Sequence, residues 1–259
     1  MEEPLKLSLV EGIARLILNR PKSFNAFNQE MIRFMGERLF ELSRDPLVVG
    51  VVITGEGKAF CAGADLKCLS DSGKSPGDAL HALAARYHQA ILEIRRMPKP
   101  VVAAINGIAA GGGFSIALAC DFRVMDASAV FRQAYTTNGL SIDGGGTFTL
   151  PRLVGMARAM EIAAFDRPIS ARQALSWGLV TEMVKDGQAM GRAIEMAEEI
   201  KKVPLSSFAA SKKLITDSFD TSFETQLEKE RELLSMCADH PNGREGIAAF
   251  LEKREPVYI

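Results

Sequence analysis

A run of small residues in the middle of the chain has the composition of an anion-binding turn. Residues 107–113, Gly-Ile-Ala-Ala-Gly-Gly-Gly, follow the apolar stretch Val101 to Ile105 after a single residue, Asn106. We expect a strand, a turn with almost no side chains and then the start of a helix. Backbone amides are unpaired at a helix N-terminus, where the helix dipole favours negative charge. Main-chain groups alone could therefore hold an anionic oxygen here, the alternative being a tight turn without a ligand.

A second turn of mostly small residues, 57–66, follows the strand-like segment Val51 to Thr54. Parallel strands place their following turns on one edge of a sheet, where ligands of open α/β folds bind. Amides from both turns could therefore converge on a single oxygen. That arrangement is an oxyanion hole, which stabilises the negative charge that develops on a reacting carbonyl oxygen.

With these motifs the chain resembles the enoyl-CoA hydratase/isomerase, or crotonase, superfamily over essentially its whole length. The segments that carry the resemblance are residues 19–26, 59–66, 99–113, 171–180 and 244–254. The resemblance implies an α/β fold, a crotonase-like spiral of ββα repeats with a C-terminal helical trimerisation region. It also implies an acyl-CoA thioester substrate whose carbonyl oxygen is bound by the amides of Ala64 and Gly112. Coenzyme A is then part of the substrate, and no separate cofactor is expected.

The resemblance also implies positions that contact the substrate or its coenzyme A moiety: Lys22, Phe24, Ala62, Asp65, Leu66, Gly111 and Lys253. The first two match positions along the pantetheine and phosphates, and the main chain of residues 62–66 matches the adenine pocket. Lys253 is a candidate for the 3′-phosphate, because a lysine acts on phosphate as a mobile point charge.

The catalytic side chains depart from the two-glutamate pattern of the family's hydratases. Hydration needs a base for the water and an acid for the α-carbon, but the matching positions here hold Ser115 and Tyr135. Asp143, followed by three glycines, matches the catalytic aspartate of the ring-opening and double-bond-shifting isomerases of phenylacetate-type catabolism. We expect Asp143, buried beside apolar residues and therefore more basic, to shuttle a proton between two carbons. Bonding the amides of its own turn is the alternative role, and enoyl-CoA hydration is an alternative activity.

His88 indicates a second type of reaction. The 4-halobenzoyl-CoA dehalogenases, a hydrolytic branch of the superfamily, carry a catalytic histidine at the matching place, a nucleophilic aspartate matching Asp143 and a tryptophan matching Tyr135. Dehalogenase- or hydrolase-type nucleophilic catalysis by Asp143 and His88 is therefore the second hypothesis. A third, from another class, is a non-catalytic scaffold subunit that binds CoA thioesters.

Strand-like and helical patterns alternate through most of the chain. We predict a hairpin of strands 5–10 and 14–18, strands 50–54, 101–105 and 122–125, and helices 29–43, 79–96 and 112–120. Residues 69–78 resemble a surface loop that could act as a lid, and Phe131, Tyr135 and Phe148 are candidate walls of the acyl pocket. From about residue 189 the pattern is purely helical. We divide the chain into an acyl-CoA-binding core, 1–202, and a helical C-terminal region, 203–259.

Charge and cysteine usage limit the classes of partner. A formal net charge of −1 lacks the basic excess that nucleic acids and anionic membranes attract, so neither is expected as a partner. The four cysteines show no metal-site spacing, and we predict no metal. No apolar run has transmembrane length and the chain opens with Met1-Glu2-Glu3, which favours a cytoplasmic protein. The expected partners are an acyl-CoA and copies of the chain, as a homotrimer or a dimer of trimers.

Overall fold

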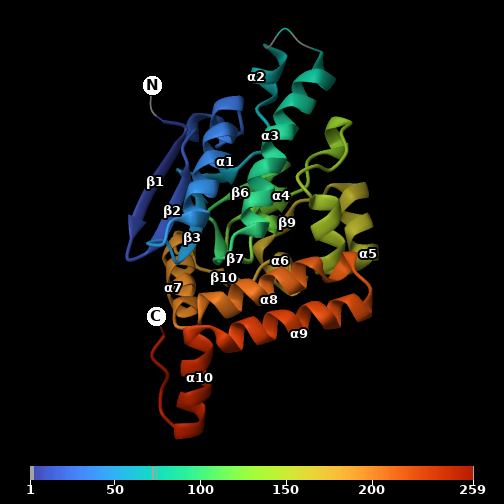
Figure 1. The fold of residues 1–259 in the computed structure, drawn as a ribbon. Coiled ribbons are helices and arrows are strands. Elements are labelled where there is room, and N and C mark those ends of the chain that lie inside the picture. Colours follow the sequence, from blue (N-terminus) through green and yellow to red (C-terminus); the bar gives the residue numbers. More distant parts are fainter. Residues whose placement is uncertain (1–2, 72, 74, 259) are drawn as a thin grey trace.

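Two β-sheets organise the chain in the computed structural model, which describes residues 3–71, 73 and 75–258 (Figure 1). The strands are β1 (Leu5–Val10), β2 (Ile13–Leu18), β3 (Gly50–Gly55), β4 (Ala59–Cys61), β5 (Val101–Ile105), β6 (Ile108–Ala110), β7 (Phe122–Asp126), β8 (Val130–Arg132), β9 (Ile169–Ser170) and β10 (Glu182–Val184). The helices are α1 (Gln29–Arg44), α2 (Leu66–Ser70), α3 (Pro76–Arg96), α4 (Gly112–Ala119), α5 (Gly146–Phe165), α6 (Ala171–Ser176), α7 (Ala189–Lys201), α8 (Leu205–Asp217), α9 (Phe223–Asp239) and α10 (Pro241–Glu252).

From β3 to β8, consecutive strands alternate between the two sheets. The larger sheet has the order β1-β2-β3-β5-β7-β10 and the smaller one the order β4-β6-β8-β9. β1 and β2 form the predicted antiparallel hairpin, and the other neighbours in the larger sheet are parallel. Each of β3, β5 and β7 is followed by a short strand of the smaller sheet and then by helix. This succession confirms the predicted α/β fold of ββα repeats.

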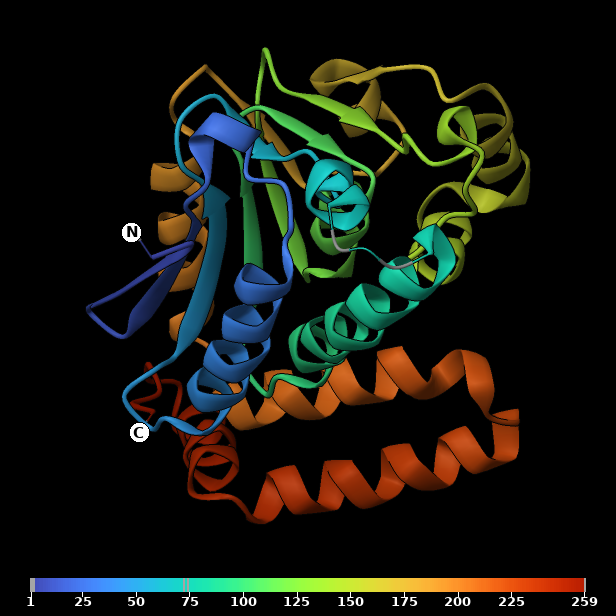
Figure 2. The ribbon, with the colours of Figure 1, turned by 90° about the horizontal axis from the view of Figure 1, so that it is seen from above.

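The larger sheet is covered by helices on both faces (Figure 2). Successive side chains of a strand point to opposite faces, so Val51 and Ile53 pack with α1 and α3 in one apolar cluster. Val52, between them, packs in a second cluster with α7. Burial on both faces explains why these strands are continuous apolar runs rather than alternating ones.

Helix α3 begins earlier than predicted, at Pro76 instead of Ala79. The Ser75 side chain accepts a hydrogen bond from the Asp78 amide, and proline is favoured at the first helical position. The predicted loop at 69–78 is therefore wrong at both ends, because residues 69 and 70 belong to α2 and residues 76–78 to α3. Residues 72 and 74 of that segment lie outside the described residues.

The C-terminal helices α8 and α9 run side by side in opposite directions, and α10 extends away from them (Figure 1). They carry large apolar side chains on their surface, including Phe250 at 82% and Leu251 at 74% exposure. The division at residue 202, between α7 and α8, stays a prediction. Across the described residues, no helix is long and apolar enough to cross a bilayer.

We expect the exposed apolar surface of the C-terminal helices to be buried between copies of the chain. Many exposed large apolar side chains on one group of helices are typical of an interface, and closed symmetric assembly is the usual way to cover them. Light scattering at micromolar concentration should therefore give the mass of a trimer or a hexamer. Phe250→Glu, which places a charge in that surface, should lower the mass, whereas Glu255→Gln should not. The mass of a single chain for the unmodified protein would contradict this prediction.

Candidate active site

Each small-residue segment contains a short strand of the smaller sheet, β4 or β6, and the turns that follow these two strands lie in backbone contact. β4 and β6 pair in parallel, so the turns that follow them emerge side by side. A Cβ atom on Gly63 would lie 2.9 Å from the Ala110 carbonyl oxygen and 3.0 Å from the Gly112 nitrogen, and Gly63 has a φ of +92°. Only glycine permits that approach and that backbone conformation.

Two amides in these turns are unpaired. Within the described part of the chain, neither the Ala64 nor the Gly112 N–H donates a hydrogen bond. The adjacent Asp65 and Gly111 amides both donate to backbone carbonyls, at 2.8 and 3.1 Å. Gly112 is the first residue of α4, so its N–H lies at the positive end of the helix dipole. Two donors from separate turns are thus available to a ligand.

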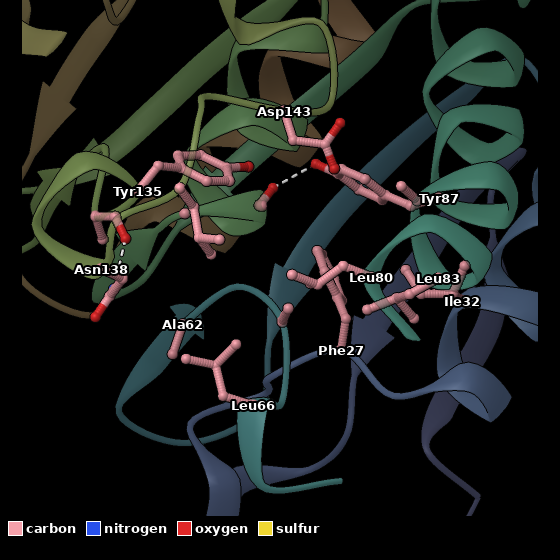
Figure 3. Close-up of a pocket in the computed structure, with 16 residues that line it drawn as sticks. Phe27, Ile32, Ala62, Leu66, Leu80, Leu83, Tyr87, Tyr135, Asn138 and Asp143 are labelled. Atoms are coloured by element: carbon pink, nitrogen blue, oxygen red, sulfur yellow. Dashed lines mark hydrogen bonds between the residues drawn. The ribbon is translucent and has the colours of Figure 1, made fainter. Parts of the chain in front are cut away.

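Ala64 and Gly112 line one cavity of about 110 Å³ (Figure 3). Its wall is mostly apolar and consists of Phe27, Ile32, Ala62, Ala64, Leu66, Leu80, Leu83, Ala84, Tyr87, Gly111, Gly112, Ala134, Tyr135, Asn138, Leu140 and Asp143. Asp143 is the one carboxylate among these residues. An apolar wall with a few convergent polar groups is the usual composition of a small-molecule site.

The Asp143 carboxylate contacts the side chain of His88. His88 Nε2, on α3, lies 2.5 Å from Asp143 Oδ1. The expectation that Asp143 is buried is wrong: its side chain is 37% exposed and that of His88 is 50% exposed, because Asp143 lies in the loop before α5. Among the described residues, the carboxylate does not bond the amides of its own turn. The Asp143 backbone carbonyl accepts a hydrogen bond from Ser115 Oγ at 2.7 Å, which fixes that turn against α4.

Two buried tyrosines complete the polar lining. The Tyr87 hydroxyl donates to the Gly112 carbonyl oxygen at 2.5 Å. The Tyr135 hydroxyl lies 3.4 Å from Ser115 Oγ. Burial raises the pKa of both phenols above the usual range. Both hydroxyls therefore stay protonated at neutral pH, and that of Tyr87 is a hydrogen-bond donor.

The family model for enoyl-CoA hydratase/isomerase matches residues 9–259. The chain belongs to the enoyl-CoA hydratase/isomerase family. A 1,2-epoxyphenylacetyl-CoA isomerase from Escherichia coli K12 is 36% identical over 254 residues, covering 97% of each chain. A 4-chlorobenzoyl coenzyme A dehalogenase-2 from Arthrobacter sp. is 32% identical over 244 residues, covering 94% of this chain and 88% of the dehalogenase. The crystal structure of an enoyl-CoA hydratase from Polaromonas sp. JS666 has a TM-score of 0.93 and 38% identity, covering 98% of this chain and 99% of that one.

These relatives of the enoyl-CoA hydratase/isomerase family are named for three different reactions, so the reaction depends on the site itself. Ala64, Gly112, Tyr135 and Asp143 line one cavity, and His88 joins them through its contact with Asp143. Of the positions expected to contact substrate or coenzyme A, Ala62, Leu66 and Gly111 line the same cavity. In the described structure, no group of three or more His, Cys, Asp or Glu side chains could hold a metal ion.

Other expected site residues lie away from the cavity. Lys22 and Phe24 are exposed on the segment before α1 and do not line it. Lys253 caps the end of α10, which lies at the opposite end of the molecule from α2 (Figure 1). A role for Lys253 at the 3′-phosphate therefore stays a prediction that requires a second subunit. Phe131 is fully buried against Phe114, and Phe148 lies beneath Arg152, so neither forms part of the pocket wall.

The apolar half of the wall was not identified from the sequence. Phe27 follows the segment 19–26, and Leu80, Leu83 and Tyr87 lie on one face of α3. Their spacing of three and four residues is a signal for one helical face. Periodicity could not show that part of this face lines a cavity, because core and pocket positions carry the same residue types.

The side chain of Asp65 holds the turn that carries Ala64. It accepts a hydrogen bond from the Arg20 guanidinium at 2.8 Å, and both side chains are largely buried. Partial burial raises the pKa of the Asp65 carboxyl, but its hydrogen bonds with Arg20 and Cys68 outweigh burial, and the net pKa is below the usual range. The contact therefore stabilises the folded state when the carboxylate is ionised.

We expect Asp65→Asn to lower the free energy of unfolding by about 1.5–3 kcal/mol at neutral pH, the usual range for a hydrogen bond to a charged group. Because the folded-state pKa is the lower one, the difference from the unmodified protein should persist down to about pH 5. It should shrink below about pH 4, as the carboxyl becomes protonated. Urea unfolding between pH 7 and 3.5 measures this. Glu56→Gln, which removes the exposed ion pair with Lys6, is the matched control and should cost less than about 1 kcal/mol.

Proposed function

We propose that this protein is an acyl-CoA isomerase of the enoyl-CoA hydratase/isomerase family, with Asp143 as the proton shuttle. The observation that carries the proposal is the content of the cavity, a single carboxylate together with two unpaired amides from separate turns. A proton shift within an enolisable thioester needs one base that can return the proton it removes. The name of the Escherichia coli relative, an epoxyphenylacetyl-CoA isomerase, supports this choice.

In the proposed reaction, the thioester carbonyl oxygen accepts hydrogen bonds from the Ala64 and Gly112 amides. Asp143 removes a proton from the α- or γ-carbon, and the electron pair of that C–H bond moves toward the carbonyl oxygen to give an enolate. The two amides stabilise the negative charge. The enolate collapses as carbon takes the proton back from Asp143 at the other position, so the mass of the substrate is unchanged.

Hydration by the two-glutamate route receives less support from the site. Ser115 and Tyr135 stand at the two hydratase positions, and Ser115 is engaged with the Asp143 carbonyl. The raised pKa of Tyr135 leaves its phenol protonated at neutral pH, so it does not supply the missing base. In a hydration, Asp143 would have to act both as the base for the water and as the acid for the α-carbon.

The contact between His88 and Asp143 favours a second candidate, nucleophilic hydrolysis. In that route a carboxylate oxygen of Asp143 attacks an activated carbon of the acyl group and displaces a leaving group such as halide. His88 then removes a proton from water, which attacks the carboxyl carbon of the resulting ester and releases the product alcohol or phenol. The relationship to the Arthrobacter dehalogenase supports this alternative.

A panel of linear, alicyclic and aryl acyl-CoAs, including epoxidised and halogenated members, tests these proposals by liquid chromatography and mass spectrometry. Isomerisation gives unchanged mass with a new retention time, which we expect. A gain of one water indicates hydration, and loss of halide or of coenzyme A indicates hydrolysis. Thioester binding by calorimetry without turnover of any member would instead support the scaffold hypothesis.

His88→Gln separates the two leading routes on whichever thioester reacts. Glutamine can still donate a hydrogen bond to Asp143, so the proton shuttle should retain activity within about tenfold. Hydrolysis should lose its base and fall by about 10²–10⁴-fold. A single turnover in oxygen-18 water adds an independent measurement, because only the covalent route introduces solvent oxygen into the Asp143 carboxylate.

A further inference from the structure

Tyr87 reaches from α3 to the turn that carries the Gly112 amide. Its side chain is buried, with 3% exposure, and its ring packs 5.2 Å from that of Phe27. The hydroxyl donates to the Gly112 carbonyl oxygen at 2.5 Å. Figure 3 shows this bond beside Asp143. A buried hydroxyl that donates a hydrogen bond to a backbone carbonyl restrains the orientation of that carbonyl.

The same side chain fills the space under the turn that follows Asp143. A Cβ atom on Gly144 would lie 2.4 Å from the Tyr87 ring and 2.7 Å from its hydroxyl oxygen. Gly144 also has a φ of +62°, which glycine adopts most readily. Tyr87 is therefore in contact with both turns of the site, the one with the unpaired amide and the one with the carboxylate. The next residue along α3, His88, contacts the carboxylate itself.

We propose that Tyr87 is a positioning residue of the oxyanion hole, which fixes the direction of the Gly112 N–H by holding the Gly112 carbonyl. The proposal rests on the proposed function in one respect, that a thioester oxygen binds at this amide. Gly111, Gly112 and Gly113 have no side chains to limit their backbone dihedrals. Functional donors must be held within about 0.5 Å of the productive geometry. The Gly112 carbonyl and amide flank one Cα, so a restraint on the first limits rotation of the second.

The chemistry of the phenol suits this role. A tyrosine donates one hydrogen bond at a fixed distance from a rigid ring, and this ring is held by Phe27 and Gly144. Its raised pKa keeps the hydroxyl protonated throughout the neutral and moderately alkaline range. The restraint is therefore present across that pH range.

Tyr87→Phe tests the proposal, since it removes the hydroxyl and keeps the ring. We expect kcat to fall by about 10–100-fold, because a displacement of about 1 Å in an active site can cost about 10²-fold. KM should change by less than about threefold, because the apolar wall is intact. Tyr258→Phe, the same chemical change at the far C-terminal end of the chain, should leave both constants unchanged.

A spectroscopic measurement distinguishes positioning from a purely structural role. Acetyl-CoA labelled with carbon-13 at the thioester carbonyl is bound to each protein, and the infrared stretching band of that carbonyl is recorded. Binding to the unmodified protein or to Tyr258→Phe should lower the carbonyl frequency relative to free acetyl-CoA. Binding to Tyr87→Phe should lower it less. Only folded protein binds the thioester, so the band reports on folded molecules even where the variant is less stable.

Different results would contradict the positioning role of Tyr87 and the oxyanion hole itself. An unchanged band and unchanged kcat in Tyr87→Phe would overturn the positioning role while leaving the oxyanion hole in place. A band that does not move when acetyl-CoA binds to the unmodified protein would instead contradict the oxyanion hole and, with it, the proposed function. A lower melting temperature in Tyr87→Phe with normal kcat and band position would show that the hydroxyl contributes only to stability.

Discussion

Asp143→Asn should lower turnover by about 10²–10⁴-fold, the range for loss of a positioned general base, while leaving thioester binding within about threefold. Asparagine has nearly the shape of aspartate and can still accept a hydrogen bond from His88, which lies 2.5 Å from the carboxylate. It cannot take up a proton at neutral pH. The amides of Ala64 and Gly112 are unaffected, so the thioester should still bind.

Calorimetry with acetyl-CoA measures the binding half of this prediction, and turnover on the best substrate of the acyl-CoA panel measures the other. Asp239→Asn, at an exposed position at the end of α9, is the matched control and should be neutral in both. Retained turnover in Asp143→Asn would contradict the isomerase and the hydrolytic proposals together, because both assign the first chemical step to this carboxylate.

Much of the fold could be predicted from the sequence because strands and helices differ in the period of their apolar residues. The strand at Val101 to Ile105 was predicted with the bounds that the structure has, since a buried parallel strand is a short apolar run between turn residues. The start of α3 was missed because its signal is local capping chemistry at Ser75 and Pro76 rather than apolar spacing.

The same distinction applies to the site, because some of its features follow from local sequence and others depend on residues far apart in the chain. Each small-residue turn is visible in the sequence, and the parallel order of the strands is enough to bring the turns to one edge. The pairing of His88 with Asp143 is different, because the resemblance to the dehalogenases suggested it and the apolar periods did not. Fifty-five residues separate the two side chains, and no spacing rule connects them. Tyr87 has the spacing of an apolar helix face, and its hydroxyl contact with Gly112 is found only in three dimensions.

Gly112→Pro should reduce turnover by at least about 10²–10³-fold, the usual cost of losing one oxyanion donor. Proline lacks the N–H but is well suited to the first position of a helix, which Gly112 occupies in α4. No internal hydrogen bond is lost, because this amide has no acceptor among the described residues. The substitution therefore removes the donor at small cost to the fold, although the proline ring also enters the space in front of the amide.

Gly112→Ala is the control that separates these effects. A Cβ atom at this position would lie 3.0 Å from the Phe27 ring, so alanine introduces the Cβ crowding that proline also brings, but keeps the N–H. We expect it to retain activity within about tenfold of the unmodified protein, and to lower the carbonyl frequency of bound acetyl-CoA as that protein does. Gly112→Pro should lose both activity and the frequency shift. Equal losses in the two variants would show that the site needs a small residue beside Phe27 rather than a donor, and the role of this amide in the oxyanion hole would have to be abandoned.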